Sequence, residues 1–145
     1  MTVSYDGNGQ TNAGTYTIIA KFTGNKNYNA IEDMKATLVI NKAKYDMSGV
    51  TYAGTETTYD GQAHSIVAEN LPAGVTASYE GNDKVEAGDY TVVVSFTGDA
   101  DNYELIPSQE VALKINKASY DMSKVTFEGN TVTYDGNVHE LSING

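Results

Sequence analysis

The sequence predicts an all-β protein in which small β-sandwiches follow one another as tandem repeats. Gly, Asn, Thr and Tyr are abundant and Leu is scarce, and these residues favour strands and turns over helices. Short apolar runs recur at roughly ten-residue spacing, with Gly and Asn between them, as in a sandwich. Motifs also return after 74 or 75 residues, which is the mark of a repeat array.

The period of the repeat is read from its motifs. Tyr45–Ser48 returns as Tyr120–Ser123 after 75 residues, and Ala13–Tyr16 returns as Ala87–Tyr90 after 74. One residue is therefore gained inside the repeat, between Phe22-Thr23-Gly24 and Asn27-Tyr28. Arrays with such a period usually serve as spacers or scaffolds.

The period divides the chain into three segments. Residues 44–118 are one complete repeat, residues 1–43 are the C-terminal part of a repeat, and residues 119–145 are the N-terminal part of another. Neither end supplies a counterpart of Leu71–Gly74, which is predicted to be a surface turn because of its Pro and Gly. The two ends are therefore predicted to be parts of one domain that is cut in a loop.

This division predicts a partner. The 27 residues of the last segment are fewer than the roughly 40 that a lone chain needs for a useful core, and they leave sheet edges open. We expect the last segment of one chain to complete residues 1–43 of another copy, giving a head-to-tail polymer or a swapped dimer. The alternative is an arbitrary cut. Neighbouring repeats of a longer parent protein are the other expected partners.

In the front half of the complete repeat, three short strands are predicted. The first is Val50–Tyr52 and the second lies near Thr57–Tyr59. The turn Asp60-Gly61 separates them from the third, at His64–Ala68. Each is short and is bounded by Gly or Asn, as expected for a sandwich.

In the back half, Val75–Tyr79, Tyr90–Phe96 and Val111–Ile115 are predicted strands. Alternation places one set of apolar residues inward and leaves Thr, Ser and Lys outward. The inward positions are Tyr90, Val92, Val94, Phe96, Val111, Leu113 and Ile115, with Tyr16, Ile18, Ala20, Phe22, Ala36, Leu38 and Ile40 as their counterparts.

One local motif resembles a known fold. Ala87-Gly88-Asp89-Tyr90-Thr91-Val92 resembles the start of strand F in immunoglobulin-like domains, where a Gly precedes the Tyr of a tyrosine corner. The resemblance implies that Tyr90 and Tyr16 bury their rings and direct their hydroxyl groups to a backbone partner.

Several motifs follow one another in a fixed order along the complete repeat. They are Tyr59-Asp60-Gly61, Ala87-Gly88-Asp89-Tyr90-Thr91, Phe96-Thr97-Gly98, Asn102-Tyr103 and Ile115-Asn116-Lys117-Ala118. This order resembles the MBG or YDG-type bacterial immunoglobulin-like repeats, and the resemblance covers essentially the whole chain. The resemblance implies an immunoglobulin-like stalk module of large cell-surface proteins, often adhesins, and hence an extracellular location.

Composition excludes several classes of function. The net charge is −10 and every basic residue is Lys, which argues against nucleic acid and against anionic membrane surfaces. No apolar run reaches the roughly 18 residues that suggest membrane insertion. There is no Cys, so neither disulfides nor thiolate chemistry are expected.

No residue is predicted to be catalytic, to bind a cofactor or to hold a metal. His64 and His139 occupy one position in successive copies, and a structural role is expected because a catalytic His needs a reactive partner. Asp99-Ala100-Asp101-Asn102 offers oxygens for Ca²⁺, but Asn25-Lys26-Asn27 in the other copy has no acid. We therefore predict a non-enzymatic stalk or spacer. The alternative is an adhesive module that binds a host glycan or protein.

Overall fold

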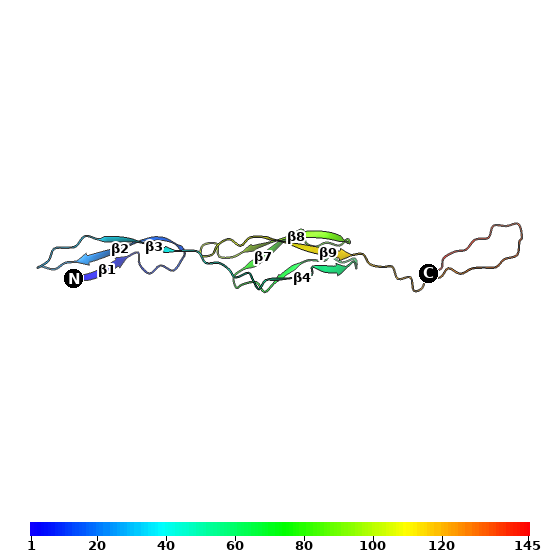
Figure 1. Ribbon diagram of the computed structural model, residues 1–145, viewed down its shortest axis with the longest axis horizontal. Helices are drawn as coiled ribbons and strands as arrows, with labels where there is room; N and C mark the ends of the chain where they lie inside the picture. Colours follow the sequence, from blue (N-terminus) through cyan, green and yellow to red (C-terminus); the bar gives the residue numbers. More distant parts are fainter.

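The computed structural model describes residues 1–145 and contains strands and no helix. The chain is drawn out along one axis, with residues 1–43 at one end, the middle unit next, and the C-terminal segment at the other end (Figure 1). The predicted all-β class and its sandwich-like layering are confirmed. We call residues 1–43 the first unit, residues 44–118 the middle unit and residues 119–145 the last segment.

The middle unit is built from two sheets. Strand order is β4-β6 in the smaller sheet and β5-β9-β8-β7 in the larger. In the larger sheet β8 runs antiparallel to both neighbours, whereas β5 runs parallel to β9. The six strands are β4 (Thr51–Ala53), β5 (Glu56–Thr58), β6 (Val67–Glu69), β7 (Thr76–Glu80), β8 (Gly88–Thr97) and β9 (Gln109–Asn116).

All the fully buried residues of the chain belong to the middle unit and form one core. Strand β8 contributes alternate residues, as its sequence pattern predicts, while Thr91 and Ser95 face solvent. Tyr90 and Val111, also predicted to face inward, are half-buried and pack against this core. The core consists of Ile66, Ala68, Val75, Val92, Val94, Phe96, Leu113 and Ile115.

The predicted strand at His64–Ala68 begins later, at Val67. The side chain of Asn82 takes both backbone groups of Ile66, accepting from its N–H at 2.7 Å and donating to its carbonyl at 2.9 Å. His64 forms a single bridge with Lys84. These bonds replace the strand ladder, and for that reason the strand is short.

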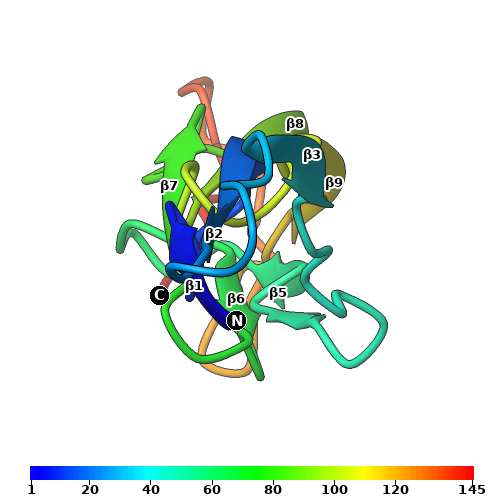
Figure 2. The ribbon, with the colours of Figure 1, turned by 90° about the vertical axis from the view of Figure 1, so that its left-hand side faces the viewer.

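The first unit is a single sheet, β1-β2-β3, made of β1 (Thr2–Asp6), β2 (Gly14–Thr23) and β3 (Met34–Ile40). Its register repeats that of β7-β8-β9: Gly14 pairs with Ile40 as Gly88 pairs with Ile115. Viewed along the rod, β3 lies in front of β8 and β9 (Figure 2). The first unit has no counterpart of β5 or of the β4-β6 sheet, and none of its residues is fully buried.

The last segment forms no strand, although it contains the sequence counterparts of β4, β5 and β6. One bridge, Thr126 with Asn144, closes it into a loop. This bridge has the register of Thr51 with Glu69 in the β4-β6 pair, because both partners are shifted by 75 residues. The segment therefore has the hairpin outline of the missing sheet, but it lacks the neighbouring sheet against which strands would form.

Candidate functional site

The hydroxyl bonds predicted for the tyrosine corners are present in both units, although both rings are half-buried and not fully buried. The Tyr90 hydroxyl donates to the Glu86 carbonyl at 2.8 Å, and the Tyr16 hydroxyl donates to the Asn12 carbonyl at 2.9 Å. Gly88 lies close against this side chain, because a Cβ atom there would be 3.2 Å from the Tyr90 ring. Each corner fixes the turn that leads into the long central strand.

In the middle unit, Tyr45 is fastened to the loop after β8. Its ring stacks on Tyr103, with centroids 4.0 Å apart, and its hydroxyl accepts the Asp99 N–H at 2.9 Å. A Cβ atom at Gly98 would lie 2.6 Å from the ring, so glycine makes this seat possible. The seat therefore holds the start of the repeat against its back half.

The first unit carries the same seat without its tyrosine. A pocket of about 350 Å³ is lined by Gly24, Asn25, Tyr28 and Ile31, among others. These are the counterparts of Gly98, Asp99, Tyr103 and Ile106 by the 74 and 75 residue steps. Tyr28 is 76% exposed. Tyr120, the counterpart of Tyr45, is 94% exposed.

A second set of contacts joins the first unit to the middle unit, and its centre is Asn102. The side-chain oxygen of Asn102 accepts the Ala13 N–H at 2.9 Å, and its carbonyl accepts the Ala43 N–H at 2.9 Å. The Glu104 N–H donates back to the Ala43 carbonyl at 2.8 Å. Lys42 Nζ donates to the Ala100 carbonyl at 2.5 Å. We call these contacts the first joint.

The loop that carries Asn102 is held by Asp99. Its carboxylate accepts the Asp101 N–H at 3.0 Å and the Asn102 side-chain amide at 2.9 Å. These bonds, the Asn102 side chain first, hold the pKa of Asp99 below its usual value. They also orient the Asn102 amide so that its oxygen points to the first unit.

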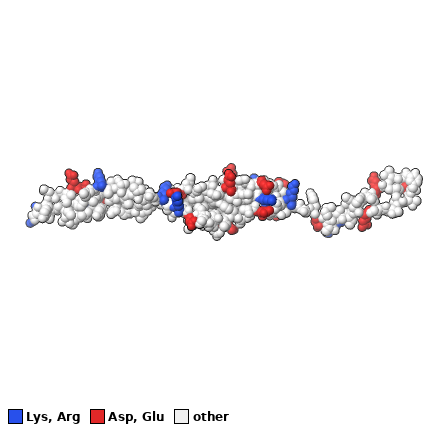
Figure 3. All heavy atoms as spheres, viewed as in Figure 1, with Lys and Arg blue, Asp and Glu red and all other residues white.

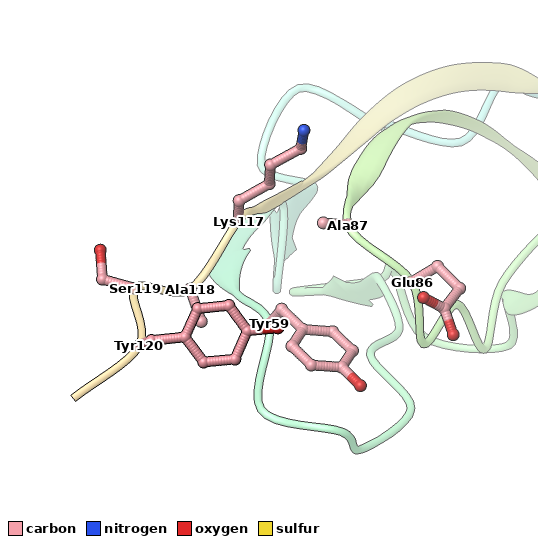
Figure 4. A pocket seen from close by; sticks show the side chains of 7 residues that line it. All are labelled: Tyr59, Glu86, Ala87, Lys117, Ala118, Ser119 and Tyr120. Carbon is pink, nitrogen blue, oxygen red and sulfur yellow. The ribbon is translucent and has the colours of Figure 1, made fainter. Parts of the chain in front are cut away.

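At the other end of the middle unit, the same position is open. A pocket of about 330 Å³ lies just beyond the end of β9, and Figure 4 shows the side chains that line it. The N–H groups of Ala87 and Ala118, counterparts of those of Ala13 and Ala43, donate no hydrogen bond there. The lining residues are Tyr59, Glu86, Ala87, Lys117, Ala118, Ser119 and Tyr120. We call this pocket the socket.

The two histidines close identical turns. Asp60 accepts from the Gln62 N–H at 2.8 Å and is 2.8 Å from His64 Nε2. Asp135 is bonded in the same way to the Asn137 N–H and to His139 Nε2. The Gln62 N–H first, then His64, hold the pKa of Asp60 below its usual value. Each histidine therefore has a carboxylate partner that is already committed to a turn.

Other candidate sites have similarly local explanations. The Asp99 carboxylate, considered above for Ca²⁺, is bonded to N–H donors of its own loop. No group of three or more His, Cys, Asp or Glu side chains is placed to hold a metal ion. Lys side chains are scattered along the rod (Figure 3). The structure contains no helix that could cross a membrane.

Asn102 was not among the residues for which the sequence predicted a role. The signal was available, because Asn precedes Tyr at both Asn27-Tyr28 and Asn102-Tyr103. That repetition helps to define the period of the repeat. It does not indicate which polar side chain forms hydrogen bonds with a neighbouring unit.

Comparison with known proteins gives one match. A family model described as an MBG domain matches residues 48–119. No curated protein and no solved structure matches the chain.

Proposed function

We propose that this chain is a non-enzymatic spacer of the bacterial cell surface. Through residues 48–119 it belongs to the MBG domain family, which consists of structural repeat modules in larger surface proteins. The rod-like arrangement in Figure 1 supports this role. The short junction Asn41–Tyr45 also supports it, because the junction has neither Gly nor Pro. Its residue Ala43 forms two hydrogen bonds of the first joint. Such a junction limits swing between units.

We further propose that the last segment of one copy completes the first unit of another. The observation that carries this proposal is a set of exposed apolar side chains whose counterparts are buried in the middle unit. Leu38 is 36% exposed, whereas its counterpart Leu113 is fully buried. Leu141 is 49% exposed, whereas its counterpart Ile66 is fully buried. Burying each such side chain contributes about 1.5–3 kcal/mol.

The open edge of the first sheet supports the same pairing. In the middle unit β5 covers the outer edge of β9, through Lys114 N–H to Thr55 carbonyl and Tyr59 N–H to Asn116 carbonyl. The counterpart of β5 is Thr131–Thr133, and β3 has no neighbour on that side. Thr131–Thr133 of a second copy would therefore run parallel to 39–41 and satisfy an edge that otherwise invites unspecific pairing.

A polar clamp is also available. Asn82 holds the backbone of Ile66 through two hydrogen bonds, and the counterparts of this pair are Asn8 and Leu141. The N–H of Ala68 donates to the Tyr79 hydroxyl at 2.8 Å, a bond that Tyr5 could repeat with the last segment. The register of the incoming segment is thus specified by polar groups as well as by apolar ones.

The charges of the two ends differ in sign. Residues 1–43 carry four Lys and three acidic side chains, whereas residues 119–145 carry one Lys and four acidic side chains. The net charge of the whole chain is −10, so two copies repel each other at a distance. Attraction between these ends favours the complementary contact over others.

The mass of the particles in solution tests this proposal. Light scattering after size exclusion should give multiples of 15.5 kDa that grow with concentration. Leu38→Asp and Leu141→Asp should each block one end and give single chains, because a charge would enter the core. Val138→Asp is the matched control, since Val138 is 84% exposed and the residue 75 positions earlier, Ala63, is exposed too.

A mixture of the two blocked variants makes the test specific. Leu38→Asp keeps an intact last segment and Leu141→Asp keeps an intact first unit. The mixture should form a 1:1 pair with twice the mass of one chain and nothing larger. Chains that remain single at every concentration, or a mixture that does not pair, would rule out complementation.

The exposed tyrosines do not favour the adhesive alternative. Aromatic side chains that bind a glycan would be expected in loops that differ between copies. Here Tyr5, Tyr28 and Tyr120 are exposed, but they are counterparts of Tyr79, Tyr103 and Tyr45, which pack within the middle unit. The proposed complementation would cover these rings, so no glycan is needed to explain their exposure.

A further inference from the structure

We propose that the socket at the end of β9 (Figure 4) receives the loop Gly24–Asn29 of a second copy, and that this contact forces assembly into straight head-to-tail rods instead of closed pairs. The inference rests on the complementation proposed above. It adds the orientation between successive repeats, which complementation alone leaves open.

The first joint provides the template. There the loop after β8 reaches back from the middle unit and places Asn102 on the N–H groups of Ala13 and Ala43. The socket offers the corresponding N–H groups, from Ala87 and Ala118, and neither has an acceptor within the chain. Lys117 is the counterpart of Lys42, which belongs to the first joint. Because Lys117 also lines the socket, its ammonium group is a third hydrogen-bond donor there.

The incoming loop is one residue shorter than its counterpart after β8, but it is closed by hydrogen bonds of its own. Asn25 Oδ1 accepts the Asn27 N–H at 2.9 Å, and the Tyr28 N–H donates to the Asn25 carbonyl at 3.1 Å. The corresponding bond in the middle unit runs from the Tyr103 N–H to the Asp99 carbonyl at 2.9 Å. Asn27 is exposed and is the counterpart of Asn102. Little ordering is therefore needed before the loop can dock.

The same loop links the socket to the open seat on the first unit. Tyr28, at its end, would stack on Tyr120 of the other copy, as Tyr103 stacks on Tyr45 at 4.0 Å. Tyr120 lines the socket and Tyr28 lines the open seat. The two pockets are thus the two sides of one contact, and completing the repeat brings Asn27 to Ala87 and Ala118.

The orientation follows from the first joint. The first unit continues the long axis of the middle unit (Figure 1). If the second joint repeats this geometry, each added copy extends the same line. A head-to-tail contact closes into a small ring only when the turn between copies allows it, and two straight joints per chain do not. Loss of the Asn27 contact should release this restriction.

Electron microscopy of rods, together with light scattering, tests this inference on the full chain. The unsubstituted chain should give rods that lengthen with concentration. In Asn27→Ala, the same fraction of chains should assemble, because residue 27 lies outside the core. However, the persistence length should fall at least threefold, and closed pairs of twice 15.5 kDa should appear. Asn27→Asp keeps an acceptor oxygen and should stay stiff.

Lys26→Ala is the matched control, since Lys26 lies in the same loop and its side chain forms no ion pair in the chain. It should give rods of unchanged stiffness. Asn27→Ala rods as stiff as the unsubstituted ones would overturn the joint and leave complementation standing. Closed pairs from the unsubstituted chain would do the same. Single chains at every concentration would overturn both.

Discussion

Tyr90 shows how one hydroxyl group secures the start of a strand. It donates to the Glu86 carbonyl four residues earlier, and this bond fixes the turn that presents the Ala87 N–H to the socket. The counterpart, Tyr16, does the same beside Ala13, whose N–H is used in the first joint. The corner therefore supports the joints as well as the sandwich.

Removal of that hydroxyl should destabilise the middle unit modestly. We expect Tyr90→Phe to lower the free energy of unfolding by about 0.5–1.5 kcal/mol, the net value of one hydrogen bond. Tyr52→Phe is the control, because Tyr52 packs against the same core while its hydroxyl has no hydrogen bond. Urea unfolding of both variants measures the difference, and equal losses would contradict the assigned role.

Asp99 makes the loop of the first joint sensitive to acid. Hydrogen bonds from Asn102 and from backbone N–H groups lower its pKa in the folded state. A lowered folded pKa gives stability that is complete above the unfolded value, about 3.9, and that is lost as the pH falls through the folded value. Asp46, Asp60, Asp121 and Asp135 are shifted in the same direction.

The urea midpoint of the unsubstituted chain should therefore fall as the pH drops below about 4. Asp99→Asn should unfold at lower urea than the unsubstituted chain at pH 7. The gap between the two should narrow in acid, because the carboxylate is then protonated in both states. A gap that stays constant from pH 7 to pH 3 would show that the charge of Asp99 is not involved.

At the scale of elements, the repeated register is the main regularity. Strands β1-β2-β3 pair residue for residue as β7-β8-β9 do, so a three-strand meander forms even without its covering sheet. The last segment, which contains the counterparts of β4, β5 and β6, keeps its turns but not its strands. The strands of the larger sheet can therefore form without the smaller sheet, whereas the strands of the smaller sheet do not form without the larger one.

Hydrogen exchange should report the pairing of Thr131–Thr133 with β3. By analogy with the β5-β9 bonds, the amides of Val39 and Tyr134 should become protected as the chain concentration rises. Amides of the β8-β9 ladder should show no such dependence, because they are paired within one chain. Protection of Val39 that is independent of concentration would argue against pairing between copies.

Much of this architecture follows from the sequence alone. The alternation Tyr90, Val92, Val94, Phe96 fixed the face of β8, because side chains on a strand alternate with a period of two. The late start of β6 was not predictable, since it depends on Asn82, sixteen residues away, taking the backbone groups of Ile66. The joint through Asn102 was missed for the same reason, because it connects residues 89 positions apart.

At the scale of the whole molecule, residues 44–118 have a buried core of their own, whereas residues 1–43 and 119–145 contain no fully buried residue. The middle unit contains every fully buried residue of the chain, so its stability should not depend on other copies. The repeat made from residues 1–43 and 119–145 would be an association, and its stability should rise with concentration.

Calorimetry should therefore show two transitions. The transition of the middle unit should keep its midpoint as the chain is diluted, whereas that of the shared repeat should shift to lower temperature. Leu113→Ala should lower the midpoint of the first transition, because loss of a fully buried side chain reduces the free energy of unfolding by about 2–5 kcal/mol. Leu38→Asp should abolish the second and leave the first in place. One transition that is insensitive to dilution would contradict this separation.

The parallel pairing of β5 with β9 has a mechanical consequence. In the spacer role proposed above, tension would pull the middle unit toward Lys44 at one end and toward Lys117 at the other. Because β5 and β9 are parallel, these forces would act on the pair in shear. The hydrogen bonds between the two strands would then be loaded together and not one after another. A splice built on Thr131–Thr133 and β3 would be loaded in shear in the same way, so a filament joined without covalent bonds could still resist being drawn apart.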